Sequence, residues 1–433
     1  MHLGAIGVTD VIDIRPLERA PDAVVTVPGS RSITNRALLV AALAAGPSML
    51  EGAGFSDDTD VMARAWRALG VQVAEDPAAM RFDVEGCGGH WPVTEAELDV
   101  HAAGTAMRFL TAALCTGRGH YRIDGTARMR QRPIQDLLDA LAQLGGHARS
   151  EANTGCPPVM IDANGLRGGA ATVAGDKSSQ FLSALLMAAP YAERSVTIGV
   201  QGMLIARPFV DMTLAVMRDF GVACERDGDA RFVVANGQRY RGRTYRVEPD
   251  ALGAHYFFAA AALTGGRVRV DGIGRRSVQG DARFVEVLAA MGATVTCTGH
   301  FIEVRGPAEL DGVDVDMNEM SDTALTLAAI APFARAPVRI RNVAHIRLQE
   351  SDRLHAAATE LQRLGVRVRE LGDGLEIHPS AITPGTVQTY DDHRVAMSFA
   401  LVGLRVAGIR IAEPSCVTKT FPDYFARLES LRR

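Results

Sequence analysis

Eight basic residues of this 433-residue chain lie beside glycine turns or near the expected starts of helices. An arginine can hold a carboxylate or a phosphate through two parallel hydrogen bonds, and a helix N-terminus adds N–H donors and a positive dipole end. If the segments that carry these residues converge, they suit one ligand with two anionic groups or two anionic ligands. The eight are Arg31, Arg36, Arg108, Arg128, Arg132, Arg353, Arg394 and Lys419.

Two carboxylates accompany these cations. Asp322 stands at the expected start of one helix, and Glu350 stands in the expected first turn of another, which runs from Glu350 to Leu364. The ordinary role of an acid at such a position is to cap a helix or to interact with its dipole. Beside an arginine-rich anion site, a carboxylate within hydrogen-bond reach of a hydroxyl can also act as a general base. Both are therefore candidates for catalysis.

The elements that must position these residues repeat six times, about every 70–76 residues. Each repeat has an apolar helix-like run, a short break with glycine, a V-x-V-like strand and a second helix. One such repeat cannot bury its apolar face alone, so the pattern predicts six packed α/β repeats. The leading helices are expected to begin near residues 30, 104, 178, 252, 321 and 391.

The composition of the chain excludes several classes of protein. With 46 basic and 50 acidic side chains, its formal net charge is −4, so it lacks the surplus of a nucleic-acid-binding protein. Its six cysteines are far apart, which argues against a metal site and against disulfides. No apolar run reaches the length of a membrane span. We therefore expect a cytoplasmic α/β enzyme that contacts neither nucleic acid nor membranes.

Eight stretches, in order along the chain, resemble the 5-enolpyruvylshikimate-3-phosphate (EPSP) synthase family. One such match would be weak, but eight in family order are specific. The UDP-N-acetylglucosamine enolpyruvyl transferases share the fold, yet they carry a reactive cysteine before the position of Arg128, where this chain has none. The stretches are residues 28–36 (PGSRSITNR), 103–108 (AGTAMR), 128–134 (RMRQRPI), 178–181 (SSQF), 279–281 (QGD), 350–354 (ESDRL), 392–394 (DHR) and 419–424 (KTFPDY).

The resemblance implies a fold and a domain division. The fold is a two-domain inside-out α/β barrel built from six repeats of a βαβαββ-like unit. The first domain would hold three repeats over residues 27–246. The second would combine residues 1–26 with residues 247–433, so the chain would cross a hinge near residues 27 and 247. We expect a monomer.

The resemblance also implies a reaction. The enolpyruvyl group of phosphoenolpyruvate would pass to the 5-hydroxyl of shikimate 3-phosphate, through a tetrahedral intermediate and with release of phosphate. This step belongs to the shikimate pathway, which leads to chorismate and the aromatic amino acids. The family needs no metal and no organic cofactor.

Carried over position by position, the resemblance assigns three sets of residues. Asp322 would be the base on the attacking hydroxyl and Glu350 the acid at the methylene carbon, with Arg31 and His393 also in the catalytic set. Phosphoenolpyruvate would contact Arg31, Gly104, Arg128, Gln180, Arg353, Arg394 and Lys419. Shikimate 3-phosphate would contact Ser32, Arg36, Ser178, Ser179, Gln180, Asp322, His345 and Gln349.

The chain departs from the family pattern at several of these positions. Arg31 replaces the usual lysine, and an arginine cannot readily give up and recover a proton. On the acceptor side, Ala206, Phe209, His345 and Gln349 replace the usual serine, tyrosine, asparagine and lysine. Three alternatives follow. Lys177, Arg207 and His345 compensate in a true synthase, or the acceptor is another hydroxylated acid or a nucleotide, or the chain is a non-catalytic protein that binds phosphorylated ligands.

Overall fold

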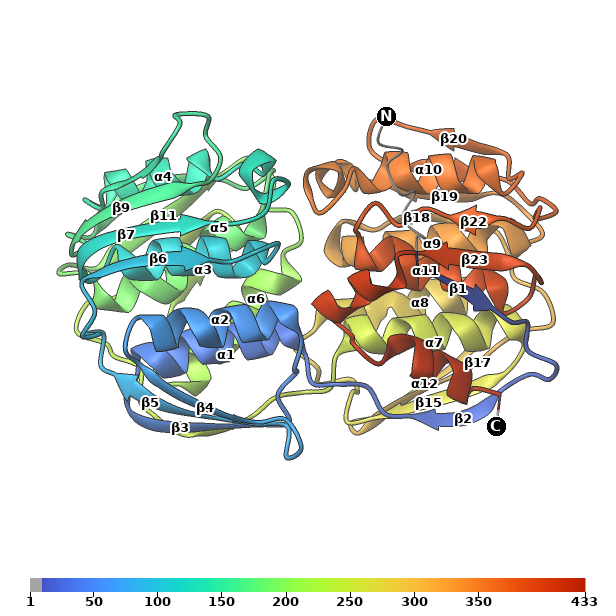
Figure 1. Cartoon of the computed structure of the whole chain (residues 1–433), viewed down its shortest axis with the longest axis horizontal. Coiled ribbons are helices and arrows are strands. Elements are labelled where there is room, and N and C mark those ends of the chain that lie inside the picture. Colours follow the sequence, from blue (N-terminus) through green and yellow to red (C-terminus); the bar gives the residue numbers. More distant parts are fainter. Residues whose placement is uncertain (1–9, 433) are drawn as a thin grey trace, which may run out of the picture. The chain divides into compact units, whose positions relative to one another are not determined.

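Five of the six repeats are built from strand, helix, strand, helix, strand and strand, whereas the sixth ends after its second helix (Figure 1). The structure, a computed structural model, describes residues 10–432; residues 1–9, which fall in the expected second domain, and Arg433 lie outside the described residues. The second repeat shows the pattern in one continuous piece: β6 (Glu95–Asp99), α3 (Gly104–Leu114), β7 (Arg118–Asp124), α4 (Gln135–Gln143), β8 (Ala148–Ser150) and β9 (Val159–Asn164).

The first and third repeats follow the same order on either side of the second. The first contains α1 (Arg31–Leu43), β3 (Ala45–Glu51), α2 (Asp57–Ala68), β4 (Gln72–Asp76) and β5 (Arg81–Cys87). The third contains β10 (Gly169–Ala174), α5 (Ser179–Ala188), β11 (Val196–Gln201), α6 (Pro208–Asp219), β12 (Glu225–Asp227) and β13 (Arg231–Val234), and is followed by β14 (Thr244–Arg246).

Three more repeats lie in the C-terminal half. The fourth contains β2 (Asp22–Val25), α7 (Ala251–Thr264), β15 (Arg267–Asp271), α8 (Phe284–Ala290), β16 (Thr294–Cys297) and β17 (Phe301–Arg305). The fifth contains β18 (Asp314–Asp316), α9 (Ala324–Ile330), β19 (Val338–Arg341), α10 (Arg353–Arg363), β20 (Val368–Glu370) and β21 (Leu375–Ile377). The sixth contains β22 (Thr386–Val387), α11 (His393–Gly403), β23 (Ile409–Ala412), α12 (Tyr424–Ser430) and the N-terminal strand β1 (Val11–Ile14).

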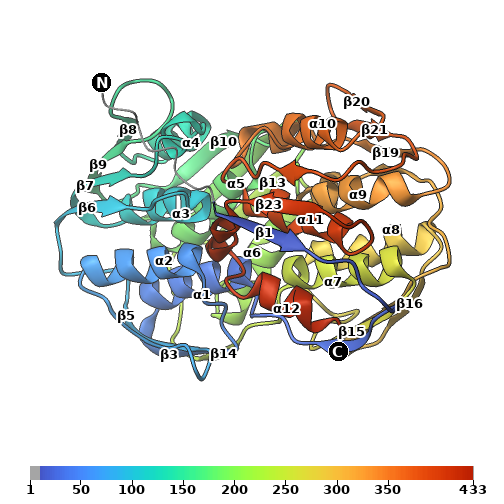
Figure 2. The same cartoon turned by 45° about the vertical axis from the view of Figure 1, so that its right-hand side comes forward.

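One sheet order recurs through the described residues. In five four-stranded sheets the first strand of a repeat pairs parallel with the second strand. The second strand pairs antiparallel with the fourth, and the third strand pairs antiparallel with the fourth at the edge of the sheet. Two first strands come from distant parts of the chain: β14 pairs with β3, and β2 pairs with β15. In the sixth sheet β1 takes the place of a fourth strand beside β23, as Figure 2 shows.

The leading helices form the interior, and the sheets cover them. Every residue of α1 from Ile33 to Leu43 is buried, as is every residue of α11. A helix that is apolar on all sides belongs in a core. The strands alternate instead, as in β7, so each sheet packs one face on helices and turns the other outward. In Figure 1, α1 and α2 lie against one face of the sheet of β3, β4 and β5. This arrangement of inner helices and outer sheets is the expected α/β fold.

The described chain divides into two compact units. The first unit holds residues 27–251 and 276–280, and the second holds the described residues up to Thr26, residues 252–275 and the chain from Asp281 onward. The domain limits expected near residues 27 and 247 lie close to two of these boundaries, and the division into folding domains stays a proposal. Within residues 10–432, no helix is long and apolar enough to cross a membrane.

A chain of buried polar groups joins the three leading helices of the second unit. His255 on α7 donates from Nδ1 to the Leu252 carbonyl at 2.7 Å, so its Nε2 accepts from the Thr326 hydroxyl at 2.8 Å. Thr326 on α9 contacts the Ser398 hydroxyl on α11 at 2.9 Å. Burial, aided by the charge of Arg394, lowers the pKa of His255 to about 3. The imidazole is therefore neutral at physiological pH.

Candidate active site

The helix starts of the first unit carry the residues that the sequence assigns to them. Helix α1 begins at Arg31, α3 at Gly104 and α5 at Ser179. Ser178 caps α5, because its hydroxyl accepts from the backbone N–H of Gln180 at 3.2 Å. The Gln180 amide donates to the hydroxyl of Thr105 at 3.4 Å, which joins the starts of α5 and α3.

Arg31 forms a largely buried ion pair. Its Nη1 donates to Oδ2 of Asp58 at 2.7 Å, and the two side chains keep 12% and 4% of their exposure. Asp58 lies in the first turn of α2, so α2 positions the guanidinium at the start of α1. A guanidinium held by a carboxylate stays charged. Arg31 can therefore hold an anion, and the pairing favours no proton-transfer role.

Arg36 is a buried cation between two aromatic rings. Its guanidinium carbon lies 5.2 Å from the ring centre of Phe109 and 5.9 Å from that of Phe209. It donates to the Thr213 hydroxyl at 2.7 Å and to the carbonyls of Ser32 and Phe209 at 2.9 and 3.1 Å. Burial and the nearby Arg31 lower the pKa of Arg36 to about 9. These contacts fix the guanidinium between α1, α3 and α6.

Gly104 makes room for a guanidinium. A Cβ built at Gly104 would lie 2.6 Å from Nη1 and 2.7 Å from Nη2 of Arg132, closer than any side chain permits. Arg132 follows the 3₁₀ turn Met129–Gln131, and Arg128 precedes that turn. Asp124, at the end of β7, accepts from both Nε and Nη2 of Arg130 at 2.9 and 2.7 Å, and so holds the turn.

The second unit brings together the two candidate catalytic carboxylates and three of the predicted cations. Asp322 accepts from Arg353 at 3.1 Å and from Arg394 at 2.8 Å. Glu350 accepts from Arg353 at 3.0 Å and lies 3.1 Å from Nζ of Lys419. Arg353 thus bridges the two acids, and each acid also has a second cation. Burial would lower the pKa of Arg353, but Asp392, Glu350 and Asp322 raise it above its ordinary value.

Both carboxylates lie shortly before an α-helix, which corrects the expectation of Glu350 in a first turn and of Asp322 at the start of a helix. Asp322 lies in the 3₁₀ turn Asn318–Thr323, ahead of α9. Helix α10 begins three residues after Glu350, because Asp352 caps it by accepting from the N–H of His355 at 3.1 Å. Glu350 therefore stands in the loop before the helix. Asp322 is therefore held by a 3₁₀ turn and Glu350 by the loop before α10, and both contact the cations from there.

Three further predicted residues lie in or beside this cluster. Gln349 accepts a hydrogen bond from Arg353, and His345 contacts the Ser321 hydroxyl at 2.8 Å. Burial lowers the pKa of His345 to about 4, so this side chain is neutral at physiological pH. His393, the first residue of α11, has no exposed surface in this structure. Direct contact of His393 with a substrate stays a prediction.

The residues expected to compensate on the acceptor side have partners of their own. Lys177 binds both carboxylate oxygens of Asp136 at 3.0 and 2.9 Å. Nε of Arg207 lies 3.9 Å from Asp211, one turn further along α6. The ring of Phe209 packs against Arg36, and its carbonyl accepts from the same guanidinium. Phe209 thus packs against Arg36, a predicted site residue, without the hydroxyl of the usual tyrosine.

Sequence reasoning overlooked two carboxylates that hold predicted arginines. Asp58 pairs with Arg31, and Asp392 pairs with Arg353 at 2.8 Å. Both stand where a helix starts, and a helix cap accounts for an acid there without further function. A spatial pairing of this kind leaves no local signal in the sequence.

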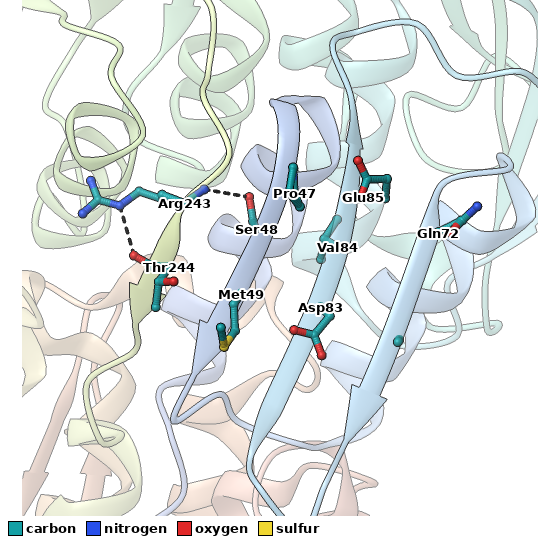
Figure 3. Close-up of a pocket in the computed structure, with 10 residues that line it drawn as sticks. Pro47, Ser48, Met49, Gln72, Asp83, Val84, Glu85, Arg243 and Thr244 are labelled. Carbon is teal, nitrogen blue, oxygen red and sulfur yellow. Dashed lines mark hydrogen bonds between the residues drawn. The ribbon is translucent and has the colours of Figure 1, made fainter.

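A separate hollow lies on the outer face of the first sheet. It has a volume of about 410 Å³, and its lining comes from β3, β4, β5 and the segment of β14, including Ser48, Asp83, Glu85 and Arg243 (Figure 3). The Arg243 backbone N–H donates to the Ser48 hydroxyl at 3.3 Å. None of the predicted site residues lines this hollow. Among residues 10–432, no group of three or more His, Cys, Asp or Glu residues is arranged to hold a metal ion.

Known proteins resemble this chain over nearly its whole length. The chain is 50% identical over 418 residues to a 3-phosphoshikimate 1-carboxyvinyltransferase of Nostoc sp., covering 96% of this chain and 98% of the relative. It is 47% identical over 414 residues to the enzyme of the same name from Laribacter hongkongensis, covering 94% and 96%.

Solved structures share the fold. An EPSP synthase from Acinetobacter baumannii matches with a TM-score of 0.82 at 25% identity, over 97% of this chain and 98% of that chain. The enolpyruvyl transferase NikO from Streptomyces tendae matches with a TM-score of 0.76 at 21% identity, over 97% of each chain, a likeness of fold alone. The family model described as EPSP synthase (3-phosphoshikimate 1-carboxyvinyltransferase) matches residues 18–428. The chain therefore belongs to the EPSP synthase family.

Proposed function

We propose that this chain transfers the enolpyruvyl group of phosphoenolpyruvate to the 5-hydroxyl of shikimate 3-phosphate and releases inorganic phosphate, as a step of the shikimate pathway. Family membership supports the reaction. The observation that carries the assignment of residues is the cluster in which Arg353 bridges Asp322 and Glu350, with Arg394 and Lys419 as their second cations.

The reaction needs two proton transfers at separate atoms, and the two carboxylates suit them. In the addition, Asp322 takes the proton of the acceptor hydroxyl, and the oxygen of that hydroxyl bonds to C2 of phosphoenolpyruvate. Glu350 gives a proton to C3, which becomes a methyl group in the tetrahedral intermediate. In the elimination, the bond from C2 to the phosphate oxygen breaks, a methyl proton returns to Glu350, and the proton held by Asp322 passes to the departing phosphate. A positioned acid or base of this kind contributes about 10²–10⁴-fold to a rate.

The cations serve the anionic groups of the donor. The carboxylate and phosphate of phosphoenolpyruvate need fixed positive charge, most of all as phosphate leaves. Without substrate, Arg353 and Arg394 bind Asp322, and Arg353 and Lys419 bind Glu350. The donor must therefore replace the protein's own carboxylates on these cations. That exchange releases Asp322 to act as a base only when an anionic substrate has arrived.

The first unit contributes the remaining assigned contacts. Arg31, Gly104, Arg128 and Gln180 are proposed for the donor, and Ser32, Arg36, Ser178 and Ser179 for the acceptor. The support for most of them is their placement at the starts of α1, α3 and α5, where backbone N–H groups favour anions, whereas Arg36 lies one turn into α1 and Arg128 stands before the 3₁₀ turn Met129–Gln131. In the second unit, His345 and Gln349 are proposed as neutral acceptor contacts in place of the family's asparagine and lysine.

Phosphate release from phosphoenolpyruvate, measured with and without shikimate 3-phosphate, tests the proposal. We expect release that depends on shikimate 3-phosphate and falls at least about 100-fold in Asp322→Ala. Asp314→Asn, an exposed acid on β18 in the same unit, is the matched control and should keep full activity. No release, with phosphoenolpyruvate binding that Arg128→Ala abolishes, would mean that the acceptor is another molecule. No release and no binding would refute the enzyme assignment.

A further inference from the structure

A fully buried aspartate, Asp392, holds one edge of the Arg353 guanidinium. Nε of Arg353 donates to Oδ2 of Asp392 at 2.8 Å, and Nη2 donates to Oδ1 at 3.2 Å. Asp392 has no exposed surface, and the Arg353 side chain keeps 2%. This two-point pairing fixes both the position and the plane of the guanidinium, because each oxygen holds a different nitrogen.

The other edge of the same guanidinium carries the contacts of the proposed donor site. Nη1 donates to Asp322 at 3.1 Å and to the amide oxygen of Gln349, and Nη2 donates to Glu350 at 3.0 Å. All five N–H groups of Arg353 thus have an acceptor in this structure. Three of these N–H groups, which we call the front edge, donate to Asp322, Gln349 and Glu350. The other two, which we call the back edge, donate to Asp392.

Asp392 also fixes the elements around Arg353. Its carboxylate accepts from the Ser351 hydroxyl at 2.9 Å and from the backbone N–H of Arg394 at 3.0 Å, so it caps α11. One buried carboxylate therefore links the loop before α10, the first residue of α10 and the start of α11. Asp392 thus contacts both arginines that hold Asp322, through the guanidinium of Arg353 and the backbone N–H of Arg394.

We propose that Asp392 is a positioning residue of the reaction, which orients Arg353 so that its front edge meets the anionic groups of phosphoenolpyruvate. The proposal rests on the proposed function, because it takes Arg353 as a ligand of the donor. Asp392 itself has no exposed surface for a substrate to touch. Its charge balances Arg353 permanently at the back edge, while the front-edge carboxylates can exchange with substrate.

A matched pair of substitutions separates positioning from simple charge. Asp392→Asn and Asp322→Asn each remove one negative charge from a direct partner of Arg353. If net charge alone governed anion binding, both variants would bind phosphoenolpyruvate more tightly. If Asp392 orients the guanidinium, Asp392→Asn weakens binding, because the asparagine presents an N–H₂ group or a neutral oxygen to the back edge. The signs of the two effects are then opposite.

The experiment measures the Kd of phosphoenolpyruvate by calorimetry and the KM values of both substrates by phosphate release. For Asp392→Asn we expect the Kd and the KM of phosphoenolpyruvate to rise about tenfold or more, because Arg353 loses an orienting partner. The KM of the acceptor should stay within about threefold of the wild-type value. In an Arg353→Lys background, where a lysine cannot form the two-point pairing, the same substitution should add less than about twofold. Melting temperatures of all variants, with Tyr121→Phe in the first unit as a destabilised control, separate these effects from unfolding.

Three outcomes overturn the proposal. One is donor binding that is unchanged or tighter in Asp392→Asn. Another is an equal loss for both substrates, and the third is an equal effect in the Arg353→Lys background. If Asp392→Asn does not fold, Ser351→Ala, which removes one donor to Asp392, takes its place, and an unchanged donor KM then overturns the proposal. A wild-type protein that releases no phosphate refutes the proposed function instead, and the Kd values for phosphoenolpyruvate still decide the role of Asp392.

Discussion

Replacement of Asp322 by asparagine is expected to stop turnover and, at the same time, to tighten the binding of phosphoenolpyruvate in the absence of acceptor. Asp322 is the proposed base, so its loss removes the proton acceptor for the attacking hydroxyl. It is also a competitor for the donor, because it accepts from Arg353 at 3.1 Å and from Arg394 at 2.8 Å. A substrate anion that takes these arginines must first displace the carboxylate.

The magnitude follows from those two bonds. A hydrogen bond to a charged partner contributes roughly 1.5–3 kcal/mol net. The asparagine keeps the shape of the side chain and can still accept through one neutral oxygen, so about one such bond no longer has to be broken. About 1.4 kcal/mol corresponds to a tenfold change in Kd. We therefore expect the Kd to fall about tenfold, while kcat falls about 10²–10⁴-fold through loss of the base.

Calorimetric titration with phosphoenolpyruvate alone measures the first effect, and phosphate release measures the second. Asp352→Asn is the matched control, since Asp352 is a neighbouring acid that pairs with Arg347 at 3.0 Å and caps α10. The control should change neither the Kd nor kcat by more than about twofold. Weaker or unchanged binding in Asp322→Asn would refute the idea that this carboxylate occupies the donor's cations.

Three further predictions concern the first unit and the buried histidine. Gly104→Ala should raise the donor KM at least about fivefold with an unchanged melting temperature, because the new Cβ displaces only the flexible end of Arg132; an unchanged KM contradicts this. Arg31→Lys should keep kcat within about fivefold, since a lysine can also pair with Asp58, and a kcat gain above about tenfold would show that proton transfer matters there. The pKa of His255 falls from 6.5 to about 3 on folding, so the unfolded chain takes up its proton first. Its stabilising contribution is complete above pH 6.5 and declines as pH falls toward 3, by about 2 kcal/mol at pH 5. Urea unfolding at pH 5 and 7.5 should show a loss that is about 2 kcal/mol larger in the wild type than in His255→Gln, because His345, whose pKa is also lowered, contributes to the loss in both. Equal losses in both proteins would contradict the assignment.

The repeated elements could be predicted because each repeat carries its own local signals. An apolar run that ends at glycine marks a helix and its stop, as for α2 before Gly70 and α6 before Gly221. The partners of some strands could not be predicted. Strand β14 pairs with β3, with Thr244 opposite Met49, and nothing near either segment specifies the other. Strands of three residues, such as β8, are also too short for a reliable period.

The sequence predicts which charged residues are candidates for the site, but it does not predict which of them form ion pairs. Arginines and acids near helix starts indicate an anion site from the sequence alone. The sequence cannot show that Arg353 contacts Asp322, Glu350 and Asp392 together, because these contacts depend on tertiary packing. It also places Glu350 in the first turn of a helix, whereas the stronger cap at Asp352 starts α10 three residues later. Competition between possible caps decides such a boundary.

The pairing of β14 with β3 imposes an order on the synthesis of this protein. The first sheet has its three strands β3, β4 and β5 by Cys87, yet its last edge position stays open until residues 244–246 have been made. Strand β2, which ends at residue 25, likewise has no partner until β15 has been made, and β15 begins at residue 267. Closing loops of this length is slow, and an open strand edge is where chains aggregate. Until both closing strands have left the ribosome, the edges of β3 and β2 therefore stay open to pairing with other chains.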